Sequence, residues 1–338
     1  MNYAIWIRRN GFLLGLLLAV VLASLFPAPG SRHGCLHADL VNNAGIALIL
    51  FLQGLSLALE KIKSGAGNWK LHLIIQSFTF IVFPIVGLLA YWMVPWVWVA
   101  EPAPIRQGLL YLCVLPSTIS TSVVLTSVAH GNTAGAQVNA ALSNIIGVVL
   151  TPLLVHELMQ TTGQSAALGP LMLKIMLLTL LPFAVGMVLR HWVYEWIDRE
   201  KAWVARISNT VIVFMVYSAF CDSFVEKVWQ EHGGGTTFKL LLCVLLLFVF
   251  MSWLIYGTCR ACRLSREDLI SAYFCSVKKT LAMGVPLAML IFGAGSQISL
   301  ILLPIMMYHP LQIFVNGLLA DRWGRARRPV VAGEQPFS

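Results

Sequence analysis

The sequence predicts an all-α polytopic membrane protein, with ten transmembrane helices arranged as two inverted five-helix repeats. Of its 338 residues, 58% are hydrophobic and only 11% are charged, whereas a soluble globular chain carries about 25% charged residues. The apolar runs are continuous and do not alternate with polar residues, which indicates helices and not the strands of a β-barrel. Seven cysteines in this length exclude a disulfide-rich scaffold.

Ten apolar runs are long enough to cross a bilayer, because a helix needs about 20 residues to cover a hydrocarbon core of about 30 Å. In chain order they lie near residues 11–27, 41–59, 71–94, 107–130, 134–155, 168–189, 207–225, 238–258, 269–292 and 297–319. The first run follows Arg8 and Arg9, so it also fits a cleaved signal peptide. The repeat symmetry described below favours a retained helix.

The positively charged residues are distributed unevenly between the two sides of the predicted membrane. With the N-terminus inside, 16 of the 23 Lys and Arg residues fall on the inner side, and only four fall on the outer side. By the positive-inside rule, both termini are cytoplasmic. The net charge of +9 therefore sets the orientation and requires no nucleic acid as a partner. The basic tail, residues 321–338, is expected to contact anionic headgroups of the lipid bilayer.

Residues 1–158 and 168–320 each hold five runs. An odd number of spans turns the second half over relative to the first, which is typical of inverted repeats in secondary transporters. The fourth run of each half is interrupted by polar residues. Superposing these two runs places Thr118 opposite Thr280. The short loops leave no room for a soluble domain and fit a bacterial inner membrane.

Pro116 interrupts the first of these two runs, because proline lacks a backbone donor and clashes with the preceding turn. Five hydroxyls follow it, and they can satisfy the freed carbonyls or bind an ion: Ser117, Thr118, Ser120, Thr121 and Ser122. Non-helical backbone at membrane depth is tolerated where it lines a cavity or is buried in protein. Two interruptions, one per half, therefore predict one central site. A simple proline kink, with hydroxyls bonded to the helix, is the alternative.

Lys278 and Lys279 lie near the middle of the ninth run, where a lysine costs about 2.5–3.5 kcal/mol on insertion scales. Consecutive helical residues point about 100° apart, so a regular helix would turn one of them to lipid or packed protein. An unwound segment relieves this conflict. Three roles stay open: a fixed cation facing an anionic solute, a carrier of a proton, or a group that holds freed carbonyls.

Several uncharged polar residues also lie at membrane depth. Asn139 and Ser143 occupy the fifth run, Thr79 occupies the third, and Thr280 follows the two lysines. Interhelical hydrogen bonds account for many such residues. Asn139 is the strongest ligand candidate in the fifth run, because this run directly follows the first interrupted one.

No motif for catalysis or for a bound cofactor is present. The sequence has no phosphate-binding glycine loop, nucleophile elbow or metalloprotease motif. Cys259 and Cys262 form a lone pair without a second pair or a nearby histidine, which disfavours zinc. An intramembrane enzyme acting on a lipid would need clustered carboxylates or histidines, and the ninth and tenth runs lack any carboxylate between Asp268 and Asp321. The sequence therefore does not predict an enzyme.

Three stretches carry a resemblance to a known family: residues 115–154 (LPSTISTSVVLTSVAHGNTAGAQVNAALSNIIGVVLTPLL), 274–288 (FCSVKKTLAMGVPLA) and 303–313 (LPIMMYHPLQI). They resemble the bile acid:sodium symporter superfamily, closest to the branch of solute carrier family 10 member 7 and its bacterial relatives. The resemblance implies two crossing broken helices, a core domain from runs 3–5 and 8–10, and a panel domain from runs 1, 2, 6 and 7. It also implies symport of a small organic anion with sodium by alternating access.

Carried over residue by residue, the resemblance implies sodium ligands after the first break and on the third helix. These are Ser120, Thr121, Ser122 and Thr79. Around them, a site for the solute or the ion would include Thr118, Asn139, Ser143, Lys278, Lys279 and Thr280. Sodium is then the coupling ion, and no other cofactor is expected.

The sequence departs from the family pattern at two places. The fifth-helix ligand positions fall on Ala136 and Ala140, and the Glu-x-x-x-Gln of the second broken helix is replaced by the segment around Lys278 and Lys279. One coherent alternative is that a lysine ammonium occupies the space of a sodium ion. The other reading of the chain is a non-transporting membrane regulator or sensor built on the same fold.

Overall fold

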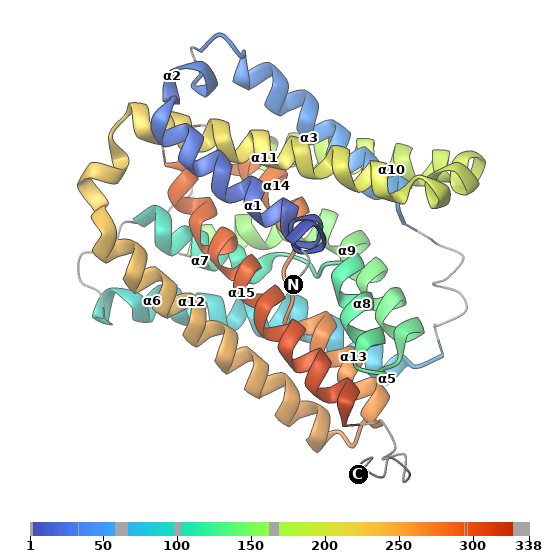
Figure 1. Cartoon of the computed structure of the whole chain (residues 1–338). Helices are drawn as coiled ribbons and strands as arrows, with labels where there is room; N and C mark the ends of the chain where they lie inside the picture. Colours follow the sequence, from blue (N-terminus) through green and yellow to red (C-terminus); the bar gives the residue numbers. More distant parts are fainter. Residues whose placement is uncertain are drawn as a thin grey trace, which may run out of the picture.

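The computed structural model describes residues 3–32, 34–57, 67–97, 103–161, 169–293, 295 and 297–326. Within these residues every regular element is a helix, as predicted (Figure 1). Eight helical segments are long and apolar enough to cross a membrane, and the apolar part of the first helix adds a shorter one at Gly11–Leu25. The described chain is therefore an all-helical integral membrane protein.

Each of the ten predicted runs coincides with a described helical segment. In chain order the elements are α1 (Tyr3–Leu25), α2 (Pro27–Gly30), α3 (Ala38–Leu55), α5 (Trp69–Ser77), η1 (Phe78–Val82), α6 (Phe83–Val97), α7 (Ala103–Val114), α8 (Ser120–Val128), α9 (Thr133–Thr161), α10 (Gly169–Arg199), α11 (Lys201–Val225), α12 (Val228–Ala261), α13 (Arg266–Ser276), α14 (Leu281–Phe292) and α15 (Ile298–Arg325). The fourth and ninth runs are each divided into two half-helices, as the polar interruptions predict.

Several helices extend beyond the apolar runs that predict them, among them α9, α10, α11, α12 and α15. The sixth run was expected to end at 189, but α10 continues to Arg199, because the polar residues after 189 follow the helix without a proline or glycine to end it. The helix α15 continues to Arg325, so the first residues of the expected basic tail, 321–338, are helical. The remainder of that tail lies outside the described residues, and so do the side chains of Arg8 and Arg9.

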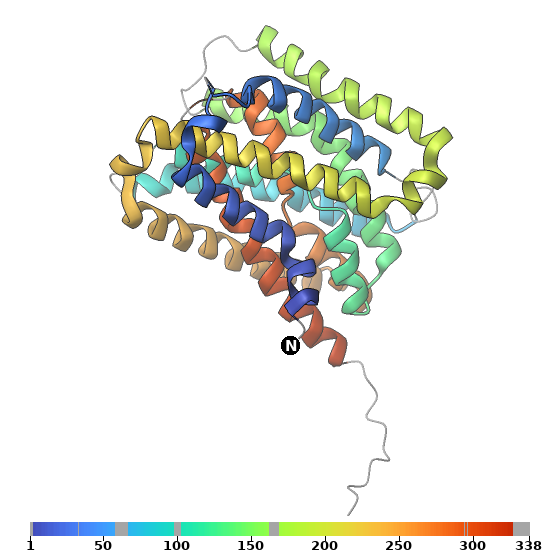
Figure 2. The same cartoon turned by 45° about the horizontal axis from the view of Figure 1, so that its top comes forward.

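The helices form two groups by their packing. In the first group, α3 packs most extensively on α10, and α11 packs on α1 and α3. In this group, α3, α10 and α11 lie across the upper part of Figure 1, and α11 (yellow) crosses in front of other helices in Figure 2. The second group contains the remaining long helices, with α7 packed on α6 and α15. The groups meet where α10 contacts α9, where α3 contacts α14, and where α11 contacts α14 and α15. A hydrogen bond joins Ser223 of α11 to Ser299 of α15.

The close approach of α3 and α10 depends on two glycines. A Cβ atom added at Gly54 would collide with the backbone oxygen of Phe183, and one added at Gly186 would collide with that of Phe51. Small residues at such positions allow helix backbones to come together, which favours packing in a membrane. These two glycines therefore hold α3 and α10 against each other.

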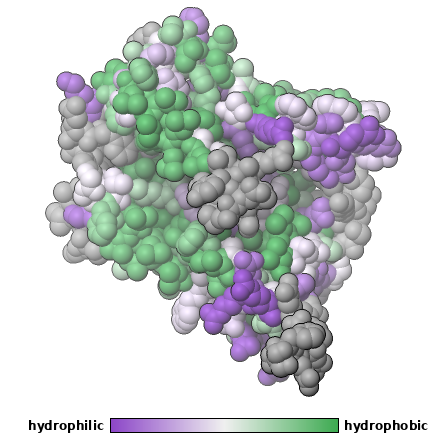
Figure 3. Space-filling model, in the orientation of Figure 1, coloured by the Kyte–Doolittle hydropathy of each residue, from purple (hydrophilic) through white to green (hydrophobic). Residues whose placement is uncertain are grey.

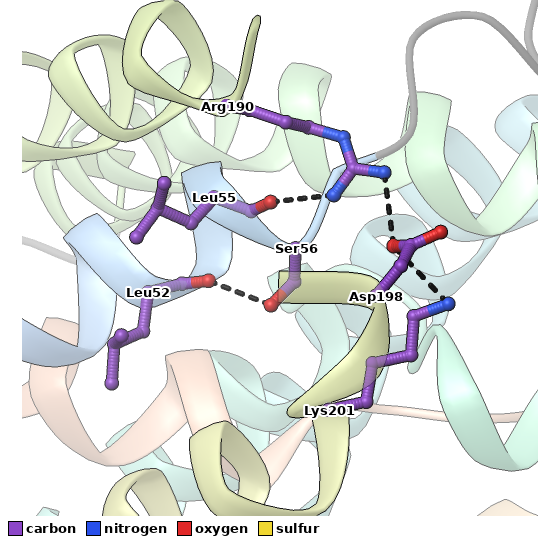
Figure 4. A network of polar contacts seen from close by, with 6 residues as sticks. All are labelled: Leu52, Leu55, Ser56, Arg190, Asp198 and Lys201. Atoms are coloured by element: carbon purple, nitrogen blue, oxygen red, sulfur yellow. Dashed lines mark hydrogen bonds and ion pairs between the residues drawn. The ribbon is translucent and has the colours of Figure 1, made fainter. Parts of the chain in front are cut away.

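A buried arginine joins the ends of three helices in the first group. Arg190 on α10 is only 4% exposed, and its Nη1 atom donates to the backbone oxygen of Leu55 at the end of α3 over 2.7 Å. Its Nη2 atom lies 3.3 Å from Asp198, which also pairs with Lys201 at the start of α11 (Figure 4). The guanidinium thus satisfies a carbonyl that the end of α3 leaves without a helical partner.

The surface carries broad apolar areas, with polar residues gathered at the helix ends (Figure 3). Large exposed apolar side chains lie along the lengths of α1, α10 and α12. Purple in Figure 3 gathers around the turn between α10 and α11 and near the end of α15, where several of the inner-side arginines and lysines occur. This distribution suits helices whose sides face hydrocarbon and whose ends face water.

Candidate functional site: the crossing of two interrupted helices

The first interruption, residues 115–119, separates α7 from α8. Five consecutive backbone carbonyls in and before it accept hydrogen bonds from other elements. Cys113 and Leu115 accept from Lys279 Nζ, Val114 from Thr151 Oγ1, Pro116 from the Thr280 amide, and Ser117 from Asn144 Nδ2. The break opened by proline is therefore closed by long-range partners, as buried backbone at membrane depth requires.

The second interruption, residues 277–280, separates α13 from α14 and is held in the same way. Gln312 on α15 accepts from the backbone amide of Lys279 and donates to its carbonyl, each over 2.8 Å. Tyr308 donates its hydroxyl to the carbonyl of Val277 over 2.6 Å. The backbone amide of Thr280 reaches Pro116 over 3.0 Å, so the two interruptions touch directly.

The ammonium of Lys279 is enclosed by three backbone carbonyls. Its Nζ atom donates to Leu115 over 2.7 Å, to Cys113 over 3.0 Å and to Thr79 over 3.3 Å. The same atom lies 4.0 Å from the centre of the Phe83 ring, a cation–π distance. An ammonium has three donors, so this cage saturates it. We call these three carbonyls and the ring the Lys279 cage.

The backbone of the third run supplies the Thr79 carbonyl through a local defect. In the π-helical turn η1, the amide of Phe83 donates to the carbonyl of Phe78, five residues back. The same pattern would pair Thr79 with residue 84, which is proline and has no N–H group. The carbonyl of Thr79 is therefore left for Lys279.

Lys278 is as deeply buried as its neighbour but is bonded differently. Both lysines have an exposed fraction of 0%. Among the described residues, Lys278 Nζ has no hydrogen-bond partner, and its electrostatic neighbours are Cys275 and His309. The unwound segment thus directs the two side chains to different surroundings. All three donors of Lys279 Nζ are hydrogen-bonded, whereas Lys278 Nζ has no bonded partner among the described residues. Lys278 is therefore the lysine at the crossing whose amino group has no hydrogen-bond partner among the described residues.

The hydroxyl groups after the first break lie together. Thr118 Oγ1 is 2.8 Å from Thr121 Oγ1 and 3.1 Å from Ser122 Oγ, and Ser122 donates to the carbonyl of Phe274. Ser120 is exposed although it begins a helix inside the span. The remaining predicted sodium ligand is Thr79. Its hydroxyl forms no hydrogen bond with this cluster and donates instead to the carbonyl of Ile75, one turn earlier in the same run.

The two candidates in the fifth run, Asn139 and Ser143, form hydrogen bonds with neighbouring protein groups. Asn139 donates to the carbonyl of Gly135 and accepts from Gln76. Ser143 accepts a 3.0 Å hydrogen bond from the amide of Ser117 and so holds the first interruption from behind. The amide of Thr280 bonds to Pro116, which places this residue in the contact between the two interruptions.

Sequence reasoning gave little weight to one polar face of α15. His309, Gln312 and Asn316 are spaced three and four residues apart, so they share a face of the helix. All three are buried, and Gln312 also lies 3.0 Å from the Nδ1 atom of His309. Their spacing inside an apolar run was the available signal.

Neither half-helix that starts at the crossing has a side-chain cap at its N-terminus. Ile119 before α8 and Thr280 before α14 make no capping hydrogen bond. Uncapped N-termini carry partial positive charge from the aligned peptide dipoles. The N-termini of α8 and α14, the C-termini of α7 and α13, and the unbonded Nζ atom of Lys278 thus all lie within a few residues of the two interruptions.

These features define a polytopic membrane protein with two broken helices that meet at membrane depth, a design typical of secondary transporters. The chain belongs to the SBF-like CPA transporter family, which it matches over residues 10–325. It is 37% identical over 328 residues to the Escherichia coli (strain K12) protein "Putative symporter YfeH", with 96% of each chain covered. It is also 30% identical over 322 residues to "Sodium/bile acid cotransporter 7" of Danio rerio, with 93% of each covered. The resemblance found in the sequence is thereby confirmed.

Proposed function

We propose that the protein is a secondary active transporter that moves a small organic anion across the bacterial inner membrane by alternating access. Ten spans would form two inverted repeats, with both termini in the cytoplasm. The group of α1, α3, α10 and α11 would act as the panel domain, and the second group would act as the core domain. Membership in a transporter family supports this proposal over an enzyme.

The observation that carries the proposal is a buried amino group at the crossing that has no hydrogen-bond partner within the described part of the chain. Lys278 is buried without a hydrogen-bonded partner among the described residues, and the uncapped ends of α8 and α14 start within a few residues of the two interruptions. A buried charge without compensation is costly. An anionic solute that binds at the crossing would compensate the positive charge of a protonated Lys278.

Coupling is proposed to differ from sodium symport. The Lys279 cage offers three carbonyl oxygens, the kind of ligand that binds a monovalent cation, and the ammonium already fills it. We propose that Lys279 supplies there the charge that a coupling ion would bring. The hydroxyls of Ser120, Thr121 and Ser122 remain the place where sodium, if it is used, would bind.

Solute flux into proteoliposomes tests the transport proposal. Purified protein is reconstituted, and uptake of labelled organic anions is measured with imposed gradients of sodium, of protons or of neither. Saturable uptake that is lost in Lys278→Met supports transport. Absence of uptake for a broad panel of anions, with correctly folded protein, would favour the non-transporting regulator or sensor instead.

Thermal stability tests the coupling proposal, because a ligand that binds only the folded state raises the melting temperature by mass action. Wild type and Lys278→Ala are expected to melt at the same temperature in sodium and in choline. Lys279→Ala, which empties the cage, is expected to melt lower and to regain stability in sodium. A sodium response of the wild type would instead support symport.

A further inference from the structure

The protonation state of His309, near the middle of α15, is fixed by its hydrogen-bonded neighbours. Its Nδ1 atom lies 3.0 Å from the side-chain nitrogen Nε2 of Gln312. The same Gln312 amide is held by the backbone of Lys279: its oxygen accepts from the Lys279 amide and its nitrogen donates to the Lys279 carbonyl, each over 2.8 Å. A backbone amide only donates and a backbone carbonyl only accepts. The Lys279 backbone therefore sets which end of the Gln312 amide is nitrogen, independently of the histidine.

This orientation determines which nitrogen of His309 carries a proton. The Nε2 atom of Gln312 has two N–H donors and no acceptor, and the Lys279 carbonyl takes one of them. The other is available to Nδ1 of His309, which must accept it and so bears no proton. Neutral His309 then carries its proton on Nε2. A histidine protonated on both nitrogens would place two donors against each other, 3.0 Å apart.

Among the described residues, no acidic side chain is placed to hold a positively charged His309 ring in this arrangement. The charged side chain in electrostatic contact with the ring is Lys278, a cation, and Cys275 lies next to that lysine. The helices α7, α8 and α14 contain no Asp or Glu. On α11, the carboxylate of Asp222 accepts from the backbone amide of Arg32.

The carboxylate of Asp222 is also distant from the ring along α15. Asp222 lies next to Ser223, which bonds to Ser299. Ser299 precedes His309 by ten residues, which is about 15 Å along a helix. The charged side chains described on α12 are basic. A second proton on the ring would therefore meet a cation and no described counter-charge.

We propose that His309 is a proton-binding site that controls the second interruption. A proton taken from water would bind Nδ1 and displace the Gln312 amide. Because one planar amide makes all three contacts, the two bonds to the Lys279 backbone would break with it, and residues 277–280 would lose this tie to α15. Return of the proton to water would restore all three contacts. This inference rests on the proposed transport function, to which it adds protonation as the step that frees the second interruption.

The ring lies where movement of the two helix groups would expose it. His309 is 7% exposed, whereas Lys278 and Gln312 are fully buried. The ring of Phe12 on α1 meets the ring of His309 edge-on, with centroids 5.9 Å apart. Since α1 belongs to the first group of helices and α15 to the second, relative movement of the groups would separate this pair and open the histidine to water. Proton binding is thereby tied to the movement that alternating access requires.

The experiment measures the melting temperature of the purified full-length protein from about pH 5 to about pH 8, on either side of the ordinary histidine pKa of about 6.5. In the folded arrangement Nδ1 holds no proton, whereas an unfolded histidine takes one up below this pH, so acid lowers the stability. His309→Asn keeps an amide oxygen that can accept from Gln312 but cannot titrate. It should melt like the wild type at the neutral end of the range and several degrees higher at the acid end. His191→Asn, which replaces an exposed histidine on α10, should follow the wild type throughout.

Two further measurements decide the question even if His309→Asn does not fold. Gln312→Leu keeps the histidine and removes its donor, so it should melt lower at neutral pH and lose the additional acid response. In protein labelled with ¹⁵N in the histidine rings, the resonances that shift in Gln312→Leu belong to His309. At neutral pH they should report an unprotonated Nδ1 that accepts a hydrogen bond and a protonated Nε2.

Two results would overturn the proposal. One is a proton on Nδ1 of His309 at neutral pH. The other is an acid response that coincides in the wild type, Gln312→Leu and His309→Asn. The expected acid response in protein that shows no solute flux would count against the transport function alone. Solute flux together with coinciding acid responses would count against the role of His309 alone.

Discussion

The backbone amide of Thr280 donates a 3.0 Å hydrogen bond to the backbone carbonyl of Pro116. This contact joins the two interrupted helices at the residues where each has lost its helical form. Ser117 and Ser122 reinforce it by donating to the carbonyls of Cys275 and Phe274. The two interruptions therefore move as one body, and a displacement of either one is passed directly to the other.

The first prediction concerns Gln312, which bonds to both backbone groups of Lys279. Gln312→Leu leaves a buried amide and a buried carbonyl without partners, and each such group costs about 1–3 kcal/mol. We expect a loss of about 2 kcal/mol or more of stability, measured as a lower melting temperature in detergent.

Asn316→Leu is the matched control, because it also replaces a buried side-chain amide by leucine, one turn away on the same face. The amide of Asn316 has no partner among the described residues, so its replacement by an apolar group is expected to be neutral or stabilising. Equal destabilisation by the two substitutions would contradict the bonding seen at Gln312.

The second prediction concerns the contact of α3 with α10. Gly186→Ala places a methyl group against the backbone oxygen of Phe51, and forced overpacking costs about 1–3 kcal/mol. The substitution should lower the melting temperature. Gly257→Ala on α12 meets open space and should be neutral or slightly stabilising, since alanine favours a helix by up to about 1 kcal/mol.

The third prediction separates the two cations around Asp198. Arg190 is buried and also holds the carbonyl of Leu55, whereas the side chain of Lys201 is 62% exposed. Removing Arg190 leaves the carbonyl of Leu55 without its partner, which costs about 1–3 kcal/mol, while an ion pair to the partly exposed Asp198 contributes about 0–1 kcal/mol. Arg190→Met should therefore lower the melting temperature clearly, and Lys201→Met should change it little. The opposite order would show that the exposed pair is the important one.

The fourth prediction concerns orientation in the membrane. Cys35 is an exposed free thiol in the segment between α2 and α3, and Cys262 lies in the turn after α12. With both termini in the cytoplasm, a membrane-impermeant maleimide should label Cys35 in intact cells and should reach Cys262 only after the cells are opened. Cys35→Ser and Cys262→Ser identify each signal. Labelling of Cys262 in intact cells would reverse the proposed orientation.

Much of the helix pattern could be predicted from the sequence, because hydropathy alone determines which segments can lie in hydrocarbon. The positions of both interruptions were predicted as well, since Pro116 and the paired lysines have no place in a regular transmembrane helix. The helices continue beyond the predicted apolar runs, to Arg199 and Arg325, because hydropathy marks the membrane span and not the end of the helix.

The roles of the two lysines could not be separated in the sequence. They are adjacent and chemically identical, and their difference arises from groups supplied by other helices. The carbonyl of Thr79 is free because of Pro84, and the carbonyls of Cys113 and Leu115 are free because the helix ends at Val114. Every residue type carries the same backbone carbonyl, so the residues of the Lys279 cage form no recognisable sequence motif. Asn316 was missed for another reason: a single amide in an apolar helix resembles ordinary packing.

The bonds from α15 to the second interruption have a consequence for biogenesis. α13 and α14 leave the ribosome before α15, yet Tyr308 and Gln312 on α15 supply the partners for Val277 and Lys279. During synthesis the two lysines must therefore enter the membrane while part of the backbone around them is still unpaired. Insertion of α15 supplies the missing hydrogen-bond partners, so we expect the second interruption to become fully bonded only at this step of assembly. A nascent chain arrested before residue 308 should remain open to quality-control proteases, even though its preceding helices are already in the bilayer.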